Sequence, residues 1–315
     1  MIYDLIVLGA GPAGLTAGLY GARAKLNTLV IEKAVEGGQI SSTTDVENYP
    51  GSLMVSGLEL AMTIKSQAEN FGTEFVMDEV IDVELEGKVK KVICKENVYE
   101  AKVIIIATGA HPRKIGCVGE DEFIGRGVSY CATCDAAFYQ DLDVYVVGGG
   151  DSAVDEALFI SKFAKNVYII HRRDELRASK SLQDRAFKNK KIHFIWNSAI
   201  EEIKGDKIVN EISIKNLKTG EITNISKKEP FGIFVFIGYV PATKVFEGKL
   251  DMEDGYILTD NNMKTSVEGV FAAGDLRVKE VRQVVTATSD GAIAAVVAEK
   301  YIAEQEGTLY EGFKN

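Results

Sequence analysis

Hydrophobic residues along the chain alternate between short, fully apolar runs and longer amphipathic segments. Apolar, β-favouring runs occur at Tyr3–Leu8 and Thr28–Ile31, and the pattern at Gly57–Phe71 is that of an amphipathic helix. Residues 80–101 then alternate in the manner of a small antiparallel meander, and a separate apolar strand at Val103–Ile106 closes the unit. This order of elements predicts an α/β unit built on a parallel sheet.

A glycine-rich turn follows the first apolar run. Gly9, Gly11 and Gly14 form G-x-G-x-x-G, and Pro12 is placed to begin a helix. Such glycines let the backbone approach a pyrophosphate, while the amino end of the helix presents partial positive charge to it. Glu32, at the end of the second apolar run, has the spacing of a carboxylate that holds ribose hydroxyls. Together these features predict a dinucleotide site.

The same order of strands, glycine-rich turn and meander repeats later in the chain. An apolar strand at Val144–Val147 leads into G-x-G-x-x-A, a second strand follows at Val167–Ile170, a meander at Asn210–Ser226, and a closing strand at Gly232–Ile237. Repetition at this scale indicates two nucleotide-binding units of related design.

The last part of the chain belongs to neither repeat. It contains V-F-A-A-G-D at Val270–Asp275 and a closing helix from about Thr286 to Ala303. Because the second unit interrupts what precedes it, we expect the tail to complete the first domain. The predicted fold is therefore α/β, with two Rossmann-like three-layer nucleotide-binding domains, the second inserted in the first. The expected domains are residues 1–115 with 244–315, and residues 116–243.

The two units differ where the nucleotide is selected. In place of an acid, the second strand of the second unit runs into H-R-R-D-E-L-R at 171–177. Guanidinium groups pair well with a 2′-phosphate, so this run favours NADPH over NADH. The alternative is that these arginines only form the exposed, basic start of a helix.

Two cysteines lie just ahead of the second nucleotide loop. Cys131 and Cys134 form C-x-x-C, and Asp135 follows them. Such a pair is a redox disulfide, half of a zinc site, or two inert buried thiols. Cys94 and Cys117 are isolated and the three histidines are scattered, so we expect no metal. The neighbouring nucleotide loop favours redox chemistry.

Composition and charge limit the kinds of molecule that the protein is expected to bind. The 315 residues are 46% hydrophobic and carry a formal net charge of −10. That charge argues against general affinity for nucleic acid or an anionic membrane, and no uncharged apolar stretch approaches the roughly 18 residues of a membrane span. The chain opens directly on a strand, which leaves no room for a signal peptide, and it has four cysteines. We expect a cytoplasmic protein in a reducing compartment.

Over nearly its whole length the chain resembles bacterial-type, low-molecular-weight thioredoxin reductases. The resemblance rests on an ordered set of motifs: G-A-G-P-A-G at 9–14, G-G-Q at 37–39, E-N-Y-P-G at 47–51, C-A-T-C-D at 131–135, G-G-G-D-S-A at 148–153, H-R-R-x-x-x-R at 171–177, and G-D with R-Q at 274–275 and 282–283. Larger relatives, such as lipoamide and glutathione reductases, carry their cysteine pair near the first nucleotide unit. Here the pair lies in the second.

The resemblance implies FAD in the first domain, NADPH in the second, thioredoxin as partner, and a homodimer. The implied FAD residues are Gly9, Ala10, Gly11, Pro12, Ala13, Gly14, Glu32, Lys33, Gly37, Gly38, Gln39, Asn48, Thr108, Gly109, Gly274, Asp275, Arg282, Gln283 and Val284. The implied NADPH residues are Gly148, Gly150, Asp151, Ser152, Ala153, His171, Arg172, Arg173 and Arg177. The polar loop at 37–51 could instead be a surface excursion.

The resemblance also implies roles for the redox residues. Cys134 would face the flavin, Cys131 would attack the partner disulfide, and Asp135 would protonate the leaving thiolate, unless Asp135 only starts a helix. Some clostridial relatives have lost the NADPH motifs and use ferredoxin, but this chain keeps both motifs. Reduction of another dithiol protein, an NADPH oxidase and a non-enzymatic redox sensor remain alternatives.

The order of the motifs also predicts movement. The cysteine pair and the NADPH loop share one domain, whereas the flavin belongs to the other, and both must reach the same ring. We therefore expect the second domain to rotate about two glycine-containing connections, near 116–119 and 238–243.

Overall fold

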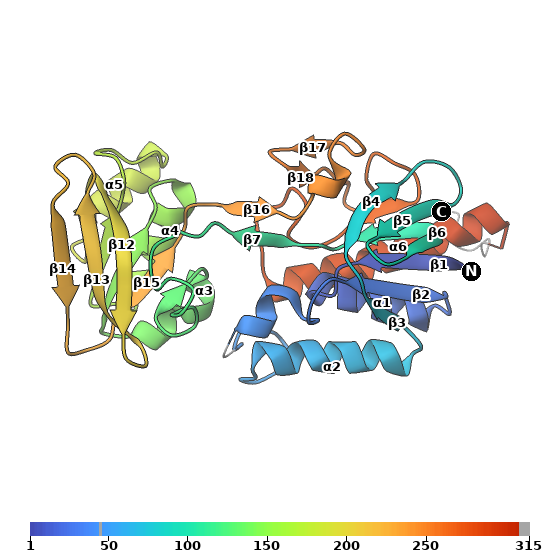
Figure 1. The fold of residues 1–315 in the computed structure, drawn as a ribbon, viewed down its shortest axis with the longest axis horizontal. Coiled ribbons are helices and arrows are strands. Elements are labelled where there is room, and N and C mark those ends of the chain that lie inside the picture. The colour runs from blue at the N-terminus through green and yellow to red at the C-terminus, as the bar shows by residue number, and fades with distance from the viewer. Residues whose placement is uncertain (44–45, 309–315) are drawn as a thin grey trace. The chain divides into compact units, whose positions relative to one another are not determined.

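The structure is a computed structural model that describes residues 1–43 and 46–308. It divides into two compact units (Figure 1): unit 1 comprises Met1–His111 and Val240–Asn315, and unit 2 comprises Pro112–Tyr239. Both divisions lie a few residues before the expected boundaries. Thr44 and Asp45, which belong to the predicted cofactor loop, lie outside the described residues.

Unit 1 is organised around a mostly parallel sheet in the order β3-β2-β1-β6-β5-β4, with β19 also on β6. The strands run parallel from β3 to β6 and β19, and antiparallel through β5 and β4. Its strands are β1 (Ile2–Leu8), β2 (Thr28–Glu32), β3 (Glu74–Met77), β4 (Val80–Glu84), β5 (Lys90–Cys94), β6 (Val98–Ile106), β17 (Met252–Glu253), β18 (Tyr256–Ile257) and β19 (Val270–Ala272). Its helices are α1 (Pro12–Arg23), α2 (Gly57–Asn70) and α6 (Val284–Glu306), with 3-10 turns η1 (Gly38–Ser42) and η3 (Lys244–Phe246).

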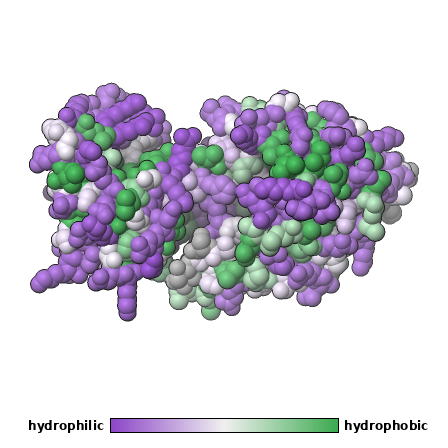
Figure 2. All heavy atoms as spheres, viewed as in Figure 1, coloured by the Kyte–Doolittle hydropathy of each residue, from purple (hydrophilic) through white to green (hydrophobic). Residues whose placement is uncertain are grey.

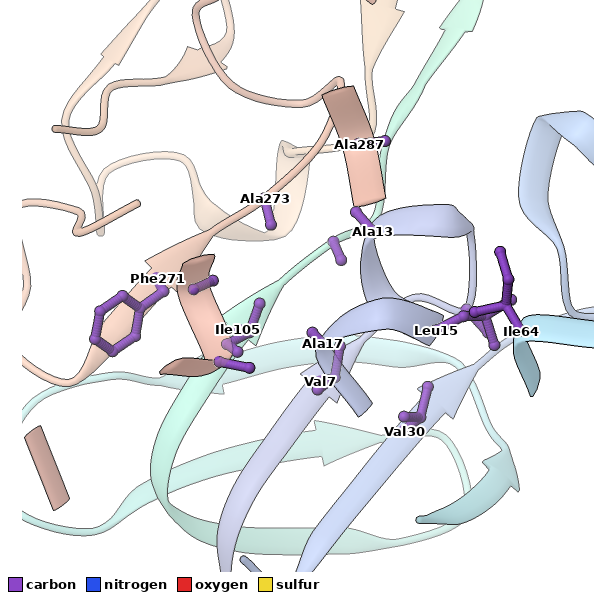
Figure 3. Close-up of a cluster of buried hydrophobic side chains, with 14 of the residues drawn as sticks. Val7, Ala13, Leu15, Ala17, Val30, Ile64, Ile105, Phe271, Ala273 and Ala287 are labelled. Carbon is purple, nitrogen blue, oxygen red and sulfur yellow. The ribbon is translucent and has the colours of Figure 1, made fainter. Parts of the chain in front are cut away.

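Alternate residues of β1 divide the core of unit 1 into two layers. Leu5 and Val7 pack against α1, α2 and α6, whereas Ile6 and Leu8 pack against the meander and the segment that contains Phe246. Figure 3 shows part of the helical layer, where Ala13 of α1, Ala287 of α6 and Ala273, which follows β19, come together. These small side chains allow the two helices and the end of β19 to approach closely.

One prediction for unit 1 was wrong in detail. The last meander strand and the closing apolar strand are a single strand, β6, which pairs with β5 at its start and with β19 at its end. Lys102 interrupts the apolar pattern, which made the strand look like two. Its ammonium group reaches Asp4 at 2.7 Å and Glu306 at 2.6 Å, so the lysine stays in the strand without burying its charge.

Unit 2 repeats the layered plan with a separate meander sheet. The parallel sheet has the order β11-β10-β9-β15-β8, and a second sheet has the order β12-β13-β14. Its strands are β8 (Val128–Ser129), β9 (Asp143–Val147), β10 (Asn166–Ile170), β11 (Ile192–Ile195), β12 (Ser198–Gly205), β13 (Val209–Asn216), β14 (Ile222–Ser226) and β15 (Gly232–Val235). Its helices are α3 (Ala132–Asp135), α4 (Asp151–Ile160) and α5 (Lys180–Lys188), with the 3-10 turn η2 (Ala136–Tyr139).

The helices of unit 2 cover Val144 and Val146 on one face of β9, and the meander covers Tyr145 and Val147 on the other. The predicted two-domain, three-layer α/β fold is confirmed. No described helix is both long enough and apolar enough to cross a membrane. Polar side chains cover most of the visible face of each unit (Figure 2).

Several strands were not predicted from the sequence, among them β3, β11 and β12. The edge strands β3 and β11 are short, and each has an exposed polar residue, Glu74 and His193 respectively. Strand β12 precedes Asn210, where the meander was predicted to start. Irregular pairing between Ile200 and Glu202 disrupts its alternation, so the strand pattern is hidden.

The chain passes between the units in β7 (Ala110–Pro112) and β16 (Tyr239–Pro241), which pair in a two-stranded sheet. The glycine-rich stretch expected to be one connection begins a few residues later and is held in unit 2. The Val118 amide donates to the Glu201 carbonyl at 3.2 Å, and a Cβ on Gly119 would lie 2.1 Å from the Ile203 carbonyl oxygen. Gly119 therefore serves close packing against β12.

Candidate functional site

The candidate residues of unit 1 gather at the carboxyl edge of its parallel sheet. Gly9 follows β1, Glu32 ends β2, Thr108 and Gly109 follow β6, and the Gly274–Asp275 turn follows β19. Ligands of open α/β sheets bind at this edge, because the loops that follow parallel strands meet there.

The glycines of the first loop permit contacts that no side chain would allow. Gly9 has φ +103°, and a Cβ on it would lie 2.5 Å from the Ala107 carbonyl oxygen. A Cβ on Gly14 would lie 1.8 Å from the Gly9 carbonyl oxygen, so helix and strand touch through backbone. At Gly11 the nearest atom to such a Cβ is 4.0 Å away, so this glycine keeps space open rather than filling a contact.

Helix α1 leaves its amino end available to an anion. Pro12 is at its start, no side chain caps it, and its first turn has no acidic residue, while Ala13 is buried in that turn. The positive end of the helix dipole is therefore uncompensated beside the open space at Gly11. This arrangement fits a phosphate group of the dinucleotide expected from the sequence.

Glu32 and the loop after β2 close around the same place. Glu32 accepts the Ala10 amide at 2.8 Å and the amide of the exposed Lys33 at 2.9 Å. Gly37 donates to the Ala10 carbonyl at 2.8 Å, and a Cβ on Gly38 would lie 3.1 Å from the Gly11 Cα. The next residue, Gln39, donates its side-chain amide to the Ala110 carbonyl.

Asp275 carries a polar atom that fits a bound hydroxyl or phosphate group. Its Oδ1 is buried and has no hydrogen-bond partner among the described residues. Burial raises the pKa of its carboxyl, which the charges of Lys279 and Arg282 oppose. The turn beside it is held by Asp290 of α6, whose Oδ2 accepts the Gly274 amide at 3.0 Å.

The amino end of α6 brings the last candidates of unit 1 together. Gln283 caps the helix reciprocally with Thr286, and Val284 is the first helical residue. Asn48, from the loop after β2, donates to the Gln283 side chain at 3.2 Å, and Arg282 lies over the ring of Tyr256 at 4.6 Å. A hollow of about 580 Å³ opens beside this helix end. The residues that line it are Lys279, Glu280, Val281, Val285, Thr286, Ser289 and Asp290.

The glycine loop of unit 2 repeats this geometry. A Cβ on Gly148 would lie 2.4 Å from the Phe236 carbonyl oxygen and 2.6 Å from Cβ of Ala153. Gly150 precedes α4, which has no side-chain cap, and the exposed Ser152 lies in its first turn. Asp151, the first residue of α4, accepts the Ser179 amide with its carboxylate at 2.7 Å.

Three exposed arginines, Arg172, Arg173 and Arg177, lie in the run that follows β10, close enough to His171 for their charges to act on it. The Arg177 and Ala178 amides both donate to the Gly149 carbonyl, so the H-R-R run folds back over the glycines. Burial, followed by the charges of Arg177, Arg172 and Arg173, lowers the pKa of His171. None of the three guanidinium groups has an ion-pair partner in the part of the chain that is described. They form a cationic site without internal neutralisation.

The sequence motifs did not indicate that the His171 imidazole lies against Gly149. The imidazole lies so close that a Cβ on Gly149 would be 2.4 Å from it, which explains the middle glycine of G-G-G. His171 Nε2 is buried without a partner among the described residues. An acceptor or donor on a bound nucleotide fits this nitrogen.

The cysteine pair is a disulfide in unit 2. Cys131 and Cys134 are bonded, with Cα atoms 5.3 Å apart, and both are half-buried. Cys131 immediately precedes α3, and Asp135 both ends that helix and immediately precedes the 3-10 turn η2 as its N-cap residue. Burial and the charge of Asp135 raise the pKa of Tyr139 to about 12.

The other two cysteines, Cys94 and Cys117, have thiols with raised pKa values. Burial raises the pKa of the Cys117 thiol to about 11 and that of Cys94 to about 12, so neither forms much thiolate near neutrality. Within residues 1–43 and 46–308, no three His, Cys, Asp or Glu side chains gather as metal ligands would.

Two buried carboxylates that bind segments next to candidate residues were not identified from the sequence. Glu120 binds backbone and Tyr130 just ahead of the disulfide, and Asp290 binds the turn at Asp275. For Asp290 a signal existed, because it lies among Ala287, Gly291 and Ala294 on the buried stripe of α6. Glu120 lies in a polar run, where nothing in the pattern distinguishes it.

Comparison with known proteins agrees with this geometry. The sequence model of a family described as pyridine nucleotide-disulphide oxidoreductase matches residues 3–291. A thioredoxin reductase of Peptoclostridium acidaminophilum is 59% identical over 306 residues, which cover 96% of this chain and 97% of the relative. One from Peptoclostridium litorale is 57% identical over 96% of this chain and 98% of that protein.

Among solved structures, the thioredoxin reductase from Streptococcus pyogenes has a TM-score of 0.92 and 46% identity, and the match covers 96% of this chain and 99% of that one. The family implies flavin and nicotinamide cofactors. On the full-length match of motifs, sequence and fold, this chain belongs to the pyridine nucleotide-disulphide oxidoreductase family, among the thioredoxin reductases.

Proposed function

We propose that the chain is an NADPH-dependent thioredoxin reductase that binds FAD in unit 1 and NADPH in unit 2. Thioredoxin is the proposed partner, and we place the enzyme in the cytoplasm as a homodimer. The observation that carries the proposal is the disulfide Cys131–Cys134, which shares unit 2 with a glycine loop and with three arginines around His171 that form no ion pair among the described residues.

The cofactors, when bound, supply hydride and electron transfer that reduces the disulfide. In the proposed exchange, the Cys131 thiolate attacks one sulfur of the partner disulfide and displaces the other as a thiolate, which Asp135 would protonate. Cys134 then attacks Cys131, re-forms the internal disulfide and releases the second partner sulfur. One disulfide is reduced and one is formed, so electrons balance.

Each unit supplies binding groups that suit its proposed nucleotide. In unit 1, the α1 amino end would hold the pyrophosphate, Glu32 the adenosine ribose, and Asp275 a hydroxyl or phosphate oxygen. In unit 2, Arg172, Arg173 and Arg177 would hold the 2′-phosphate.

The test is turnover by the purified flavoprotein with NADPH or NADH and several thioredoxins. We expect NADPH to support reduction of a thioredoxin, measured by thiol release under anaerobic conditions. A protein that consumes NADPH only with oxygen would be an oxidase, and one that reduces another dithiol protein instead would keep the chemistry with a different partner. No NADPH turnover with any acceptor would contradict the proposal.

We predict that Gly11→Ala separates cofactor binding from folding. The added Cβ would meet only the Gly38 Cα, at a comfortable 4.0 Å, so stability of the flavin-free protein should change by no more than about 1 kcal/mol. FAD affinity should fall by at least about tenfold, because the methyl group occupies the approach of the pyrophosphate. Flavin titration and thermal unfolding measure the two effects. Gly14→Ala is the contrasting variant, since its Cβ would overlap the Gly9 carbonyl and should damage folding itself.

We predict that Asp275→Asn stabilises the flavin-free protein while weakening FAD binding. Burial holds the folded-state pKa of this carboxyl above its ordinary 3.8, so folding is favoured while the group is protonated and disfavoured as pH rises through the folded pKa. Asparagine removes that penalty, by about 1–3 kcal/mol at pH 7. The gain should shrink as pH falls through the folded pKa. Urea unfolding between pH 4 and 8 measures it, and a variant less stable than wild type at pH 7 would argue against the prediction.

A further inference from the structure

Glu120 is a buried carboxylate for which the proposed exchange has no use. It is only 2% exposed, and its two oxygens accept three hydrogen bonds within unit 2. Oε1 accepts the Ile115 amide and the Tyr130 hydroxyl, each at 2.8 Å, and Oε2 accepts the Gly116 amide at 2.7 Å. Ile115 and Gly116 belong to the segment that brings the chain into unit 2 from β7. Glu120 therefore joins this incoming segment to Tyr130.

Tyr130 is joined to the outgoing segment as well. Its carbonyl accepts the hydroxyl of Tyr239 at 3.1 Å, and Tyr239 is the first residue of β16, where the chain leaves unit 2. The Tyr130 ring packs against the core below β12 and β13. Burial, followed by the Glu120 hydrogen bond and charge, raises the pKa of Tyr130, so its hydroxyl remains a donor. Both connections of unit 2 thus converge on one residue.

That residue directly precedes the redox disulfide. Cys131 follows Tyr130, and its backbone is held from the same side by Ser129. The Cys131 amide donates to Ser129 Oγ at 3.1 Å, and Ser129 Oγ–H donates to the Cys131 carbonyl at 3.2 Å. The backbone leading to Cys131 is therefore fixed at two consecutive residues, one bound locally and one bound to distant segments.

We propose that Tyr130 is a positioning residue for Cys131, which it ties through Glu120 and Tyr239 to both segments that connect unit 2 to the rest of the chain. The proposal rests on the proposed function, in which Cys131 is the attacking sulfur. A fixed Cys131 backbone keeps the two sulfurs at high effective concentration, which favours the disulfide over the dithiol. Movement of either connection would then alter how readily the disulfide is reduced.

The test measures the disulfide–dithiol equilibrium of the full-length holoenzyme in dithiothreitol buffers of graded reduced-to-oxidised ratio. Thiols are trapped by alkylation and counted by mass spectrometry of the peptide that contains Cys131 and Cys134. The measurement needs neither NADPH nor a protein partner. It can therefore fail or succeed independently of the proposed reductase activity.

We expect Tyr130→Phe to make reduction easier, with the equilibrium constant raised roughly three- to tenfold, as for loss of one buried hydrogen bond. Glu120→Gln should shift it in the same direction. Because both changes break one contact, the double variant should shift the equilibrium by clearly less than the product of the single effects. Tyr168→Phe is the matched control, since Tyr168 packs against the same core cluster away from both connections, and its equilibrium should stay at the wild-type value.

Tyr239→Phe tests the second connection and covers the case in which Tyr130→Phe fails to fold. It removes the hydroxyl that reaches the Tyr130 carbonyl and should also ease reduction, about two- to fivefold. If Tyr130→Phe and Tyr239→Phe both lower the melting temperature but leave the equilibrium constant within error of the Tyr168→Phe control, Tyr130 is merely structural and the proposal is overturned.

Discussion

Replacing either Cys131 or Cys134 by serine is expected to lower reduction of a protein disulfide by more than about 10³-fold, as for loss of an enzyme nucleophile. Exchange requires two sulfurs in sequence, one to form the mixed disulfide and one to resolve it. In the proposed reaction, electron transfer from NADPH to the flavin would precede this step, so it should survive in both variants. Thiol release from thioredoxin measures the first activity, and anaerobic bleaching of the flavin by NADPH measures the second.

The two serine variants should differ in a way that assigns the roles. Cys134→Ser leaves Cys131 able to attack but unable to be released, so a mixed disulfide with thioredoxin should accumulate on non-reducing gels. Cys131→Ser should form none, and its Cys134 thiolate should give a long-wavelength charge-transfer band with oxidised flavin. The reverse pattern would exchange the proposed roles. Cys117→Ser is the matched control, because the half-buried thiol of Cys117 has a pKa raised to about 11 and should contribute nothing.

Replacing Arg172 and Arg173 together by alanine is expected to weaken use of NADPH by two to four orders of magnitude. Each charge-assisted hydrogen bond to the 2′-phosphate contributes roughly 1.5–3 kcal/mol, so two contribute about 3–6 kcal/mol. NADH lacks that phosphate, and its kcat/KM should barely change. Rates of flavin reduction with both nucleotides, across a range of concentrations, measure the effect.

A matched control for this pair is Arg185→Ala. Arg185 is also an exposed arginine of unit 2, but it lies on α5 and forms only a 3.8 Å ion pair with Asp155. It should leave both nucleotides unaffected. Equal losses with NADPH and NADH in the Arg172/Arg173 double variant would mean that the two arginines support the fold rather than nucleotide choice.

Much of the fold was accessible from the sequence because its signals are local. A strand, a glycine turn and a helix follow one another within about two dozen residues in each unit, and each step depends on neighbouring positions. The structure places β1, α1 and β2 where the pattern predicted them, and likewise β9, α4 and β10. The short edge strands β3 and β11 were missed, because they bury too few side chains to produce a strong pattern.

The candidate site, like the fold, could be predicted from the sequence only where its signals are local. Several candidates are local motifs, whose chemistry can be inferred from the residues themselves. They are the glycine loops, Glu32, the arginine run and the cysteine pair. The gathering of Gly9, Glu32 and the Gly274–Asp275 turn at one sheet edge in unit 1 follows from parallel strands, which the order of elements implies. What the motifs did not indicate is that Asp275 keeps a buried, unpartnered oxygen, or that Asp151 is engaged by the Ser179 amide.

By itself, then, the sequence determined the family, the two nested α/β units and the redox pair, since each depends on residues close together in the chain. Tertiary structure alone decided which buried polar groups meet. Asp290 reaches the Gly274 amide across 16 positions, and the Tyr239 hydroxyl reaches the Tyr130 carbonyl across 109. A buried donor or acceptor must find a partner, but only the packed chain brings residues so far apart in sequence within hydrogen-bond distance.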